Sequence, residues 1–450
     1  MNHLTALDAG FLKVEDADRR VSMAIGGLAV IEGPVPDQDA LVSAFDQRIR
    51  ACPRFGQRLR LRPFDLGAPE WVDDPGFGIE RHVRRAALPH PGDERELFRL
   101  IADVMARRLD RNRPLWEIWV IEGLSDDRWA MLIKVHHCMA DGIAVTHMLA
   151  GLSDDGVGDS SVHHIRGREA VTPQPSPKSV LGGLWNASTA VVAGAAEIAI
   201  GLMRSAASPL NGPIGDLRRY CGARVPLADI ELVRQTFGVT VNDVALAAIT
   251  ESFRNVMVEH GQRPDSLRTL VPVSMRSVDA FDKTDNRVSV MLPDLPVDEE
   301  NAVRRLRTVH ARLCQAKAGG QREAGNAFVS IANRIPFVLT AWAIGLLTRI
   351  PQRGVVTVAT NVPGPRRALR VMGRQVLGVY PVPPIAMQLR TGIAMLSYAD
   401  DMFFGILADY DVVADVDDLA RGIEAAVARL VAISKRRKAS RTRGPLSLVV

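Results

Sequence analysis

The stretch Lys134–Ala144, which reads KVHHCMADGIA, contains the residues on which the interpretation of this chain rests. The apolar, β-rich run Trp129–Val135 leads directly into His136 and His137, and Asp141–Gly142 then turns the chain into a helical pattern. A junction of strand, turn and helix presents side chains at the edge of a cleft, where catalytic residues are often carried. Successive strand residues point to opposite faces, so we expect only one of the two histidines to face that cleft.

The chemistry that best suits this stretch is proton transfer. A neutral imidazole, with an ordinary pKa of about 6.5, can take a proton near pH 7. We therefore assign His137, together with His136, to a catalytic site, and we give Asp141 the task of fixing the local geometry, with an arginine partner as one option. A zinc site ranks lower, because two opposed histidines and one carboxylate do not complete a tetrahedral site. We expect neither a metal nor a cofactor.

Length and composition exclude several classes of protein. The 450 residues are 47% hydrophobic and 24% charged, which suits two domains or one large α/β body and excludes disordered, collagen-like and polytopic membrane chains. The net charge is +5, but Lys435–Arg443 alone carries six basic residues. The remainder is therefore close to neutral. The basic excess lies in one terminal tail and lacks interleaved aromatics, so we expect no nucleic-acid partner.

The cysteines and the N-terminal segment bear on localisation. The four cysteines are far apart and have no CxxC or metal-ligand spacing, which favours a reducing compartment: Cys52, Cys138, Cys221 and Cys314. The first 20 residues are acidic where a signal peptide is basic and then apolar. No apolar run reaches the roughly 20 residues that a spanning helix needs. We expect a cytoplasmic protein, with peripheral attachment to the inner face of the plasma membrane or to a lipid droplet left open. The oligomeric state is also open.

The chain divides at a proline-rich boundary, Val171–Ser179 (VTPQPSPKS), which cannot sustain a helix or a central strand. We predict a first lobe at residues 1–160, a linker or crossover with a weakly apolar helix at 161–214, a second lobe at 215–434 and a basic tail at 435–450. Strands that alternate with helices throughout indicate an α/β or α+β class.

Hydrophobic periodicity predicts elements in both lobes. In the first lobe we expect a strand at Met23–Ile31, helices at Asp39–Ile49 and Leu97–Arg108, and a hairpin of Trp116–Glu122 with Trp129–Val135. In the second lobe we expect a helix at Asn242–Phe253 that starts with a capping Asn/Asp pair, strands at Arg287–Leu292 and Gly354–Ala359, a hairpin around Asp400–Asp401, and a closing helix at Val416–Ser434.

Several short motifs resemble those of one enzyme family. His136, His137, Asp141 and Gly142 match the HHxxxDG signature of the CoA-dependent acyltransferase superfamily, which peptide-synthetase condensation domains share. Further motifs, in the same chain order, resemble those of wax ester synthases/diacylglycerol acyltransferases, most closely the mycobacterial-type triacylglycerol synthases. They are the opening Leu7 to Glu15, the PLW of Pro114, Leu115 and Trp116, the ND of Asn242 and Asp243, the PVS of Pro272–Ser274 with Arg276, and the NVPGP of Asn361–Pro365.

The resemblance implies both a fold and an activity. The implied fold has two chloramphenicol-acetyltransferase-like lobes, each a mixed sheet with helices, joined by the Pro/Gly-rich crossover, with a substrate channel between them. The implied activity moves a long-chain acyl group from acyl-CoA, a substrate and not a cofactor, to a lipid hydroxyl. The product is triacylglycerol from diacylglycerol, or a wax ester from a fatty alcohol. Acyl length and acceptor preference stay open.

Each supporting motif also has a structural interpretation. Trp116 is equally well explained as a core or interface aromatic. Asn242 is explained as a helix cap, and Asn361 as part of a rigid Pro/Gly turn. Arg276 is either a solvated strand end or the partner of a buried carboxylate.

Two other functions compete with lipid acyl transfer. One is a catalytically weak or inactive lipid-binding scaffold, docked to membranes by the basic tail. The other is amide-forming condensation, which shares the histidine signature but requires carrier-protein partners, and this sequence encodes no neighbouring synthetase module.

Overall fold

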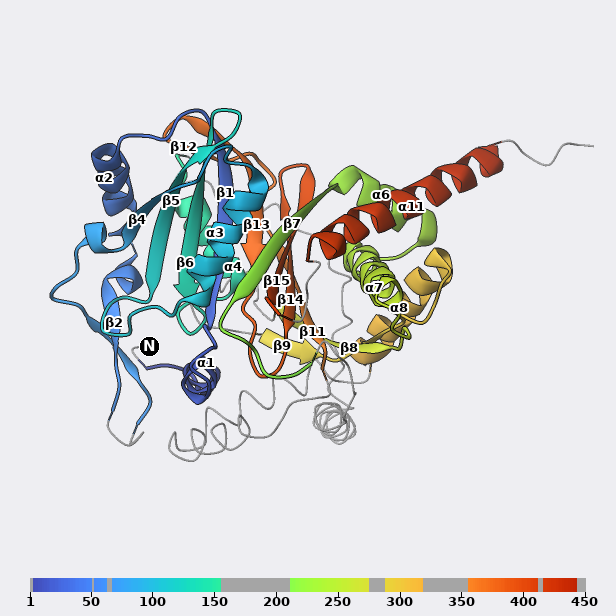
Figure 1. Ribbon diagram of the computed structural model, residues 1–450, viewed down its shortest axis with the longest axis horizontal. Helices are drawn as coiled ribbons and strands as arrows, with labels where there is room; N and C mark the ends of the chain where they lie inside the picture. The colour runs from blue at the N-terminus through green and yellow to red at the C-terminus, as the bar shows by residue number, and fades with distance from the viewer. Residues whose placement is uncertain are drawn as a thin grey trace, which may run out of the picture.

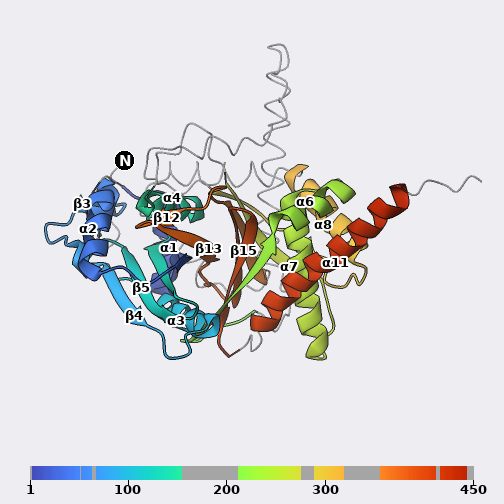
Figure 2. The same cartoon turned by 90° about the horizontal axis from the view of Figure 1, so that it is seen from above.

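The computed structural model describes residues 3–50, 52–62, 67–154, 211–274, 288–318, 355–411 and 416–442. The predicted linker and weakly apolar helix, at 161–214, lie almost entirely outside these ranges, and so does Arg276. Two large mixed sheets stand side by side, with helices packed around them (Figures 1 and 2). The α/β class with two sheet-containing lobes, expected from the sequence, is confirmed.

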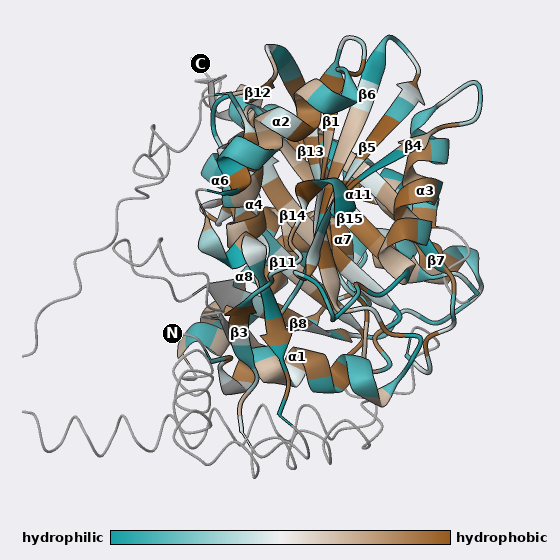
Figure 3. Ribbon diagram, turned by 90° about the vertical axis from the view of Figure 1, so that its left-hand side faces the viewer, coloured by the Kyte–Doolittle hydropathy of each residue, from teal (hydrophilic) through white to brown (hydrophobic). Residues whose placement is uncertain are grey.

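The first sheet is built mainly from the N-terminal half of the chain. Its strands are antiparallel except for the parallel pair β4 and β5. In spatial order they are β12 (Arg370–Val371), β13 (Arg374–Val382), β1 (Ala24–Glu32), β6 (Arg128–His136), β5 (Trp116–Leu124) and β4 (Val83–Ala87). The predicted hairpin is the β5–β6 pair, and the predicted first strand is β1. Hydrophobic residues concentrate along these strands (Figure 3).

Strands β12 and β13 come from the second half of the chain, yet β13 pairs along its length with β1. The division of the sequence at the proline-rich boundary is therefore not a division of the sheets. A segment within the predicted second lobe, 215–434, completes the sheet of the first. The two halves cannot separate without breaking the β1–β13 ladder.

The second sheet carries the remaining long strands. Strand β11 runs parallel to β14 and β8, and the other pairs are antiparallel. The order is β10 (Asp294–Leu295), β8 (Leu267–Ser274), β11 (Thr357–Pro363), β14 (Thr391–Tyr398), β15 (Asp401–Asp409) and β7 (Arg218–Pro226), with β9 (Val288–Met291) also paired to β8. The predicted hairpin around Asp400–Asp401 is β14–β15, in which Tyr398 pairs with Asp401.

Helices cover both sheets. The first lobe contains α1 (Ala6–Ala17), α2 (Gln38–Ile49), α3 (Glu94–Ala106) and α4 (Gly142–Leu152), and the second contains α6 (Leu227–Phe237), α7 (Val241–Glu259), α8 (Ala302–Ala318) and α11 (Val416–Thr442). A small two-stranded sheet, β2 (Gln57–Arg60) with β3 (Glu70–Asp73), lies apart. Helix α4 contacts β1 and β6 of the first sheet and β11 of the second. It therefore lies where the two lobes meet.

Aromatic side chains join the two sheets. Tyr380 of β13 packs edge-on against Phe98 of α3 and Phe403 of β15, with ring centroids 5.4 and 5.0 Å apart. Phe98 also meets Tyr220 of β7 at 5.4 Å, and the Tyr220 hydroxyl donates to the Pro381 carbonyl at 3.0 Å. Edge-to-face pairs of this kind stabilise beyond their buried area. They hold the two sheets in one register.

Helix α11 continues past the predicted end of the lobe. It runs to Thr442, so the helix end predicted at Ser434 is wrong, and the first basic residues of the predicted tail are helical. Figures 1 and 2 show this end of α11 projecting from the body. Within the described ranges, no helix combines the length and apolarity needed to cross a bilayer.

Candidate active site

The strand-to-helix junction predicted around the two histidines is present between β6 and α4. His136 is the last residue of β6, and the His137 backbone N–H donates to the Met23 carbonyl of the neighbouring chain segment at 2.8 Å. Asp141 is the N-cap of α4, where its Oδ1 accepts from the Ala144 backbone N–H at 2.8 Å. The cap fixes the start of the helix directly after the histidines.

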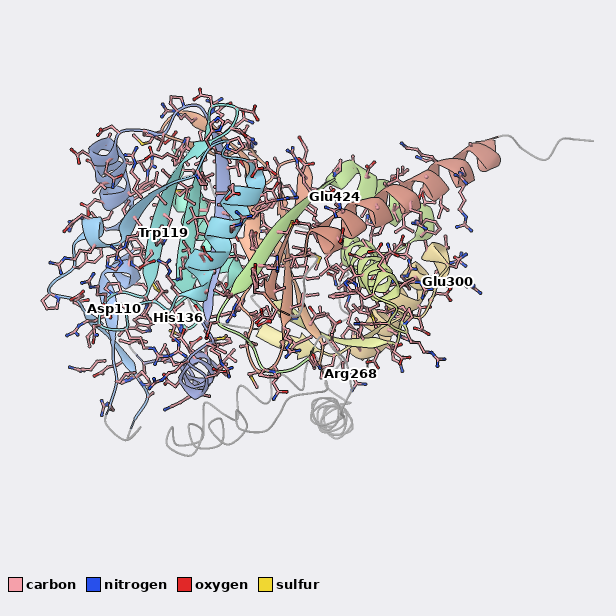
Figure 4. The ribbon with its side chains drawn as sticks, in the orientation of Figure 1. Asp110, Trp119, His136, Arg268, Glu300 and Glu424 are labelled. Carbon is pink, nitrogen blue, oxygen red and sulfur yellow. The ribbon has the colours of Figure 1, made fainter. Side chains whose placement is uncertain are left out.

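His136 points into the protein interior. It is 1% exposed, and its Nδ1 accepts from the Cys138 backbone N–H at 3.1 Å. That bond places the ring proton on Nε2, which lies 3.5 Å from Oε2 of Glu15, itself 1% exposed. Figure 4 shows His136 at the end of β6, above α1. This ring is therefore held by the scaffold, in agreement with the expectation that the two histidines face opposite ways.

Glu15 of α1 is the centre of a buried network. Its Oε2 accepts from Arg111 at 2.6 Å, and its Oε1 accepts from the Met23 backbone N–H at 3.0 Å. Burial opposes ionisation of this carboxyl, but His136, Arg111 and the Met23 amide together lower the pKa of Glu15 to about 2. Glu15 is therefore ionised at neutral pH. Through Met23 it also holds the carbonyl that receives the His137 backbone N–H.

His137 is half-buried, and Phe11 of α1 stacks on its ring with centroids 4.1 Å apart and an interplanar angle of 24°. Burial lowers the pKa of His137 to about 4, although the nearby Asp141 carboxylate favours the charged ring. The imidazole is therefore neutral at pH 7, and a neutral imidazole is able to accept a proton.

The PLW residues lie in the core beside the site. Pro114, Leu115 and Trp116 are all buried, and the Leu115 carbonyl accepts from the His136 backbone N–H at 3.0 Å. Trp116 donates to the Phe55 carbonyl at 2.8 Å and stacks on His82 with centroids 4.4 Å apart. In the described structure, the motif supports the backbone of His136 from the side opposite Met23.

The HHxxxDG and NVPGP motifs meet where α4 packs on β11. A Cβ added to Gly142 would lie 2.8 Å from Cγ2 of Val362, so only glycine fits without a shift. Asn361, the neighbour of Val362 in the second sheet, has an exposed side chain. The NVPGP segment therefore contacts the HHxxxDG turn through Val362.

The ND motif differs from its predicted role. Thr240, and not Asn242, is the N-cap of α7: Thr240 Oγ1 accepts from the Asp243 backbone N–H, and the Asp243 carboxylate accepts from the Thr240 backbone N–H at 2.7 Å. This reciprocal capping box leaves Asn242 inside the first turn, and the cap predicted at Asn242 is wrong. The carboxylate of Asp243 also accepts from His310 of α8, at 2.7 Å. The ND motif thus belongs to the helical layer of the second lobe.

Some residues that build the site had no role predicted from sequence. Phe11 and Glu15 lie four residues apart on α1, which places both on one helix face toward the two histidines. An acidic residue on the apolar face of a short N-terminal helix is the signal that points to Glu15. Arg111 gives no comparable signal, since it lies in a loop rich in charges. Among the described residues, no group of three or more His, Cys, Asp or Glu side chains could hold a metal ion.

Comparison with known proteins shows the family of the chain. The model of the wax ester synthase/diacylglycerol acyltransferase catalytic domain matches residues 4–245, and that of the WS/DGAT C-terminal domain matches residues 284–430. The chain belongs to the wax ester synthase/diacylglycerol acyltransferase family. The HHxxxDG junction and the Glu15 network both lie within the matched catalytic domain.

Individual relatives are similar to this chain over nearly its whole length. A protein of Mycobacterium tuberculosis (strain ATCC 25618 / H37Rv), named a probable diacylglycerol O-acyltransferase tgs1, is 68% identical over 100% of both chains. The solved wax ester synthase/diacylglycerol acyltransferase from Marinobacter aquaeolei VT8 is 26% identical, with a TM-score of 0.69 over 96% of this chain and 100% of that one. A condensation domain of the CDA synthetase, at 16% identity and a TM-score of 0.60 over 96% of both chains, shares the fold.

Proposed function

We propose that this acyltransferase moves a long-chain acyl group from acyl-CoA to the free hydroxyl of diacylglycerol, with His137 as the general base. The observation that carries the proposal is the state of His137: a half-buried ring at the junction of the lobes, with a pKa lowered to about 4. Such a base is uncharged at the pH of the cell. The diacylglycerol acceptor is supported by the name of the 68% identical relative.

The mechanism needs no covalent enzyme intermediate, because a thioester is already activated. As the acceptor oxygen attacks the thioester carbonyl, Nε2 of His137 takes the hydroxyl proton, because Nδ1 is fully buried. The C–S bond to CoA then breaks, and the imidazolium returns the proton to the departing thiolate. A ring whose pKa is lowered gives that proton back readily. General-base assistance of this kind contributes roughly 10² to 10⁴ in rate.

The residues around His137 act as positioning groups. Asp141 starts α4 and favours the charged ring electrostatically as the proton arrives. Glu15 and His136 hold the backbone on both sides of the junction. A fatty alcohol would present the same hydroxyl chemistry, so we propose wax ester formation as a second reaction of the same site.

The direct test is acyl transfer by purified protein. Labelled long-chain acyl-CoA is supplied with a panel of diacylglycerols and fatty alcohols, and ester products are measured for wild type, His137→Ala and His260→Ala. His260 is exposed at the end of α7 and serves as a matched histidine control. We expect His137→Ala to lose roughly 10² to 10⁴ in kcat/KM, and His260→Ala to retain it. Full turnover in a folded His137→Ala protein would remove His137 from the mechanism. No turnover in wild type would instead favour the lipid-binding scaffold.

We also propose that the basic end of α11 docks peripherally on an anionic bilayer, where diacylglycerol resides. Lys435, Arg436, Arg437 and Lys438 follow one another on the projecting end of this helix. Each basic residue near such a surface contributes on the order of 1 kcal/mol. Truncation after Ser434 should weaken binding to vesicles that contain anionic lipid and leave binding to neutral vesicles unchanged. Equal binding by the truncated and full-length proteins would refute this docking.

A further inference from the structure

A second histidine-centred cluster lies on the helices of the other lobe. His310 and Cys314 are one turn apart on α8, and Asp243 faces them from α7. His310 Nδ1 lies 2.7 Å from Asp243 Oδ2, and Cys314 Sγ lies 3.7 Å from His310 Nε2. The thiol thus contacts the imidazole, and the imidazole contacts the carboxylate, which is the order typical of activated nucleophiles.

The hydrogen bonds define which ring nitrogen carries the proton. Asp243 is almost fully buried and accepts from the Thr240 backbone N–H as well as from His310. An ionised carboxylate only accepts, so Nδ1 of His310 is the donor. The lone pair of Nε2 therefore faces the Cys314 thiol and can accept its proton. Asp243 orients the base, as the third member of a nucleophile–base–carboxylate set does.

Cys314 also differs from the other cysteines in access. Its side chain is exposed, whereas Cys138 and Cys221 are buried and Cys52 is half-buried. Burial raises the pKa of those three thiols, which keeps them protonated and unreactive. Of the four cysteines, all of which lie in the described ranges, Cys314 combines exposure with a contact to an imidazole.

The charge of α8 around Cys314 favours an anionic reactant. Arg307 and Lys317 are exposed and lie seven residues before and three residues after Cys314, which places them on the same helix face. A thioester of CoA brings a reactive carbonyl attached to a group with several phosphates. Cations on this face would attract those phosphates.

We propose that Cys314 is a self-acylation site that takes an acyl group from long-chain acyl-CoA, with His310 as its base. The inference rests on the proposed function only in taking acyl-CoA as the donor that this enzyme meets. The thiol proton moves to His310 Nε2, and sulfur attacks the thioester carbonyl. The C–S bond to CoA breaks, and the CoA thiolate takes the proton from His310. One thioester replaces another, so no oxidant or reductant is needed.

The experiment incubates full-length protein with palmitoyl-CoA and follows the intact mass, with peptide mapping to locate the adduct. We expect one palmitoyl group on Cys314, released by neutral hydroxylamine as a thioester is. Cys314→Ser should remove the adduct, Cys52→Ser should keep it, and His310→Gln should slow its formation about tenfold or more. Because Cys314 is exposed, its serine variant is expected to fold, and a melting curve checks the His310 variant.

The same measurement in a His137→Ala background separates this inference from the proposed function. Labelling of Cys314 should persist there, since the two centres share no residue. Ester formation by wild type without an adduct on Cys314 would overturn the inference and leave the proposed function intact. An adduct on Cys314 without ester formation would support the inference and contradict the proposed function. Equal labelling of Cys52, or a rate unaffected by His310→Gln in a folded protein, would also overturn it.

Discussion

The two histidine centres of this protein differ in where their carboxylates act. At the lobe junction, the buried carboxylate of Glu15 pairs with His136, while the neighbouring His137 stacks on Phe11 and is proposed to do the chemistry. On α8, the buried carboxylate of Asp243 contacts the ring of His310 itself. Glu15 acts on the His137 segment through the backbone of Met23 and through the neighbouring His136.

This difference indicates two ways of preparing an imidazole. Desolvation leaves His137 neutral and so ready to accept a proton from a hydroxyl. A direct carboxylate contact fixes the tautomer of His310 at an accessible surface. Substitutions around the first centre should therefore act through position and stability. The three sets of substitutions that follow test this, in order of decreasing expected effect.

The largest expected effect is that of Glu15→Gln. It removes one charge of a buried pair and places an amide donor beside Arg111 and His136, which are both donors toward this position. Breaking a buried ion pair costs about 3–5 kcal/mol, and the displaced junction should lower kcat by on the order of 10²-fold. Denaturant unfolding and acyl-transfer kinetics measure both quantities.

Asp16→Asn is the matched control for this substitution. Asp16 also pairs with Arg111, at 2.6 Å, but its side chain is 48% exposed. Exposed pairs contribute roughly 0–1 kcal/mol, so this variant should keep both stability and activity. If the two variants behaved alike, the Glu15 network would have no special part in placing His137.

Alanine substitutions at two glycines of α4 test how tightly this helix packs at the lobe junction. Gly142→Ala would force a Cβ to within 2.8 Å of Val362, and overpacking of this kind costs about 1–3 kcal/mol. Gly151 of the same helix has nothing within 4 Å of its added Cβ, so Gly151→Ala should stabilise by about 0.5–1 kcal/mol. Melting temperatures and kcat/KM test the pair. Rescue of Gly142→Ala by Val362→Ala is expected, and its failure would contradict a steric cause.

The smallest effects are expected from two substitutions of Asp141, which distinguish its role as a helix cap from the role of its charge. Asp141→Ala removes the N-cap of α4 and should destabilise by about 0.5–2 kcal/mol. Asp141→Asn keeps a good cap and removes the charge beside His137, so it should spare stability and lower kcat. Equal stability losses in both variants, measured by denaturant unfolding, would show that the carboxylate does more than cap the helix.

Local sequence patterns predicted much of the first lobe. The β-rich runs Trp116–Glu122 and Trp129–Val135, on either side of a polar turn, predicted the hairpin, and the Asp-Gly pair after His137 predicted the turn into α4. The pairing of β13 with β1 could not be predicted, because it joins strands more than 300 residues apart in the sequence. Only the folded chain brings those strands together.

The site could be predicted only in part, for a similar reason. The HHxxxDG residues are contiguous in sequence, so their junction was visible there. Glu15, Arg111 and Met23 reach the junction through tertiary contacts, and the opening motif that ends at Glu15 did not reveal this role. The cap of α7 was assigned to Asn242 because Asn is a favourable N-cap residue. Thr240 occupies the N-cap position instead, because it forms reciprocal hydrogen bonds with Asp243.

The pH dependence of kcat/KM tests the central claim most directly. Only the neutral ring can act as a base, so activity should be lost as pH falls through the pKa of the folded enzyme, which for His137 is about 4. The account predicts an acidic limb centred near pH 4 and a flat profile from about pH 5.5 to 8, with full activity regained when acid-treated enzyme is returned to pH 7. A limb centred near the ordinary histidine value of about 6.5 would contradict a desolvated His137 as the general base.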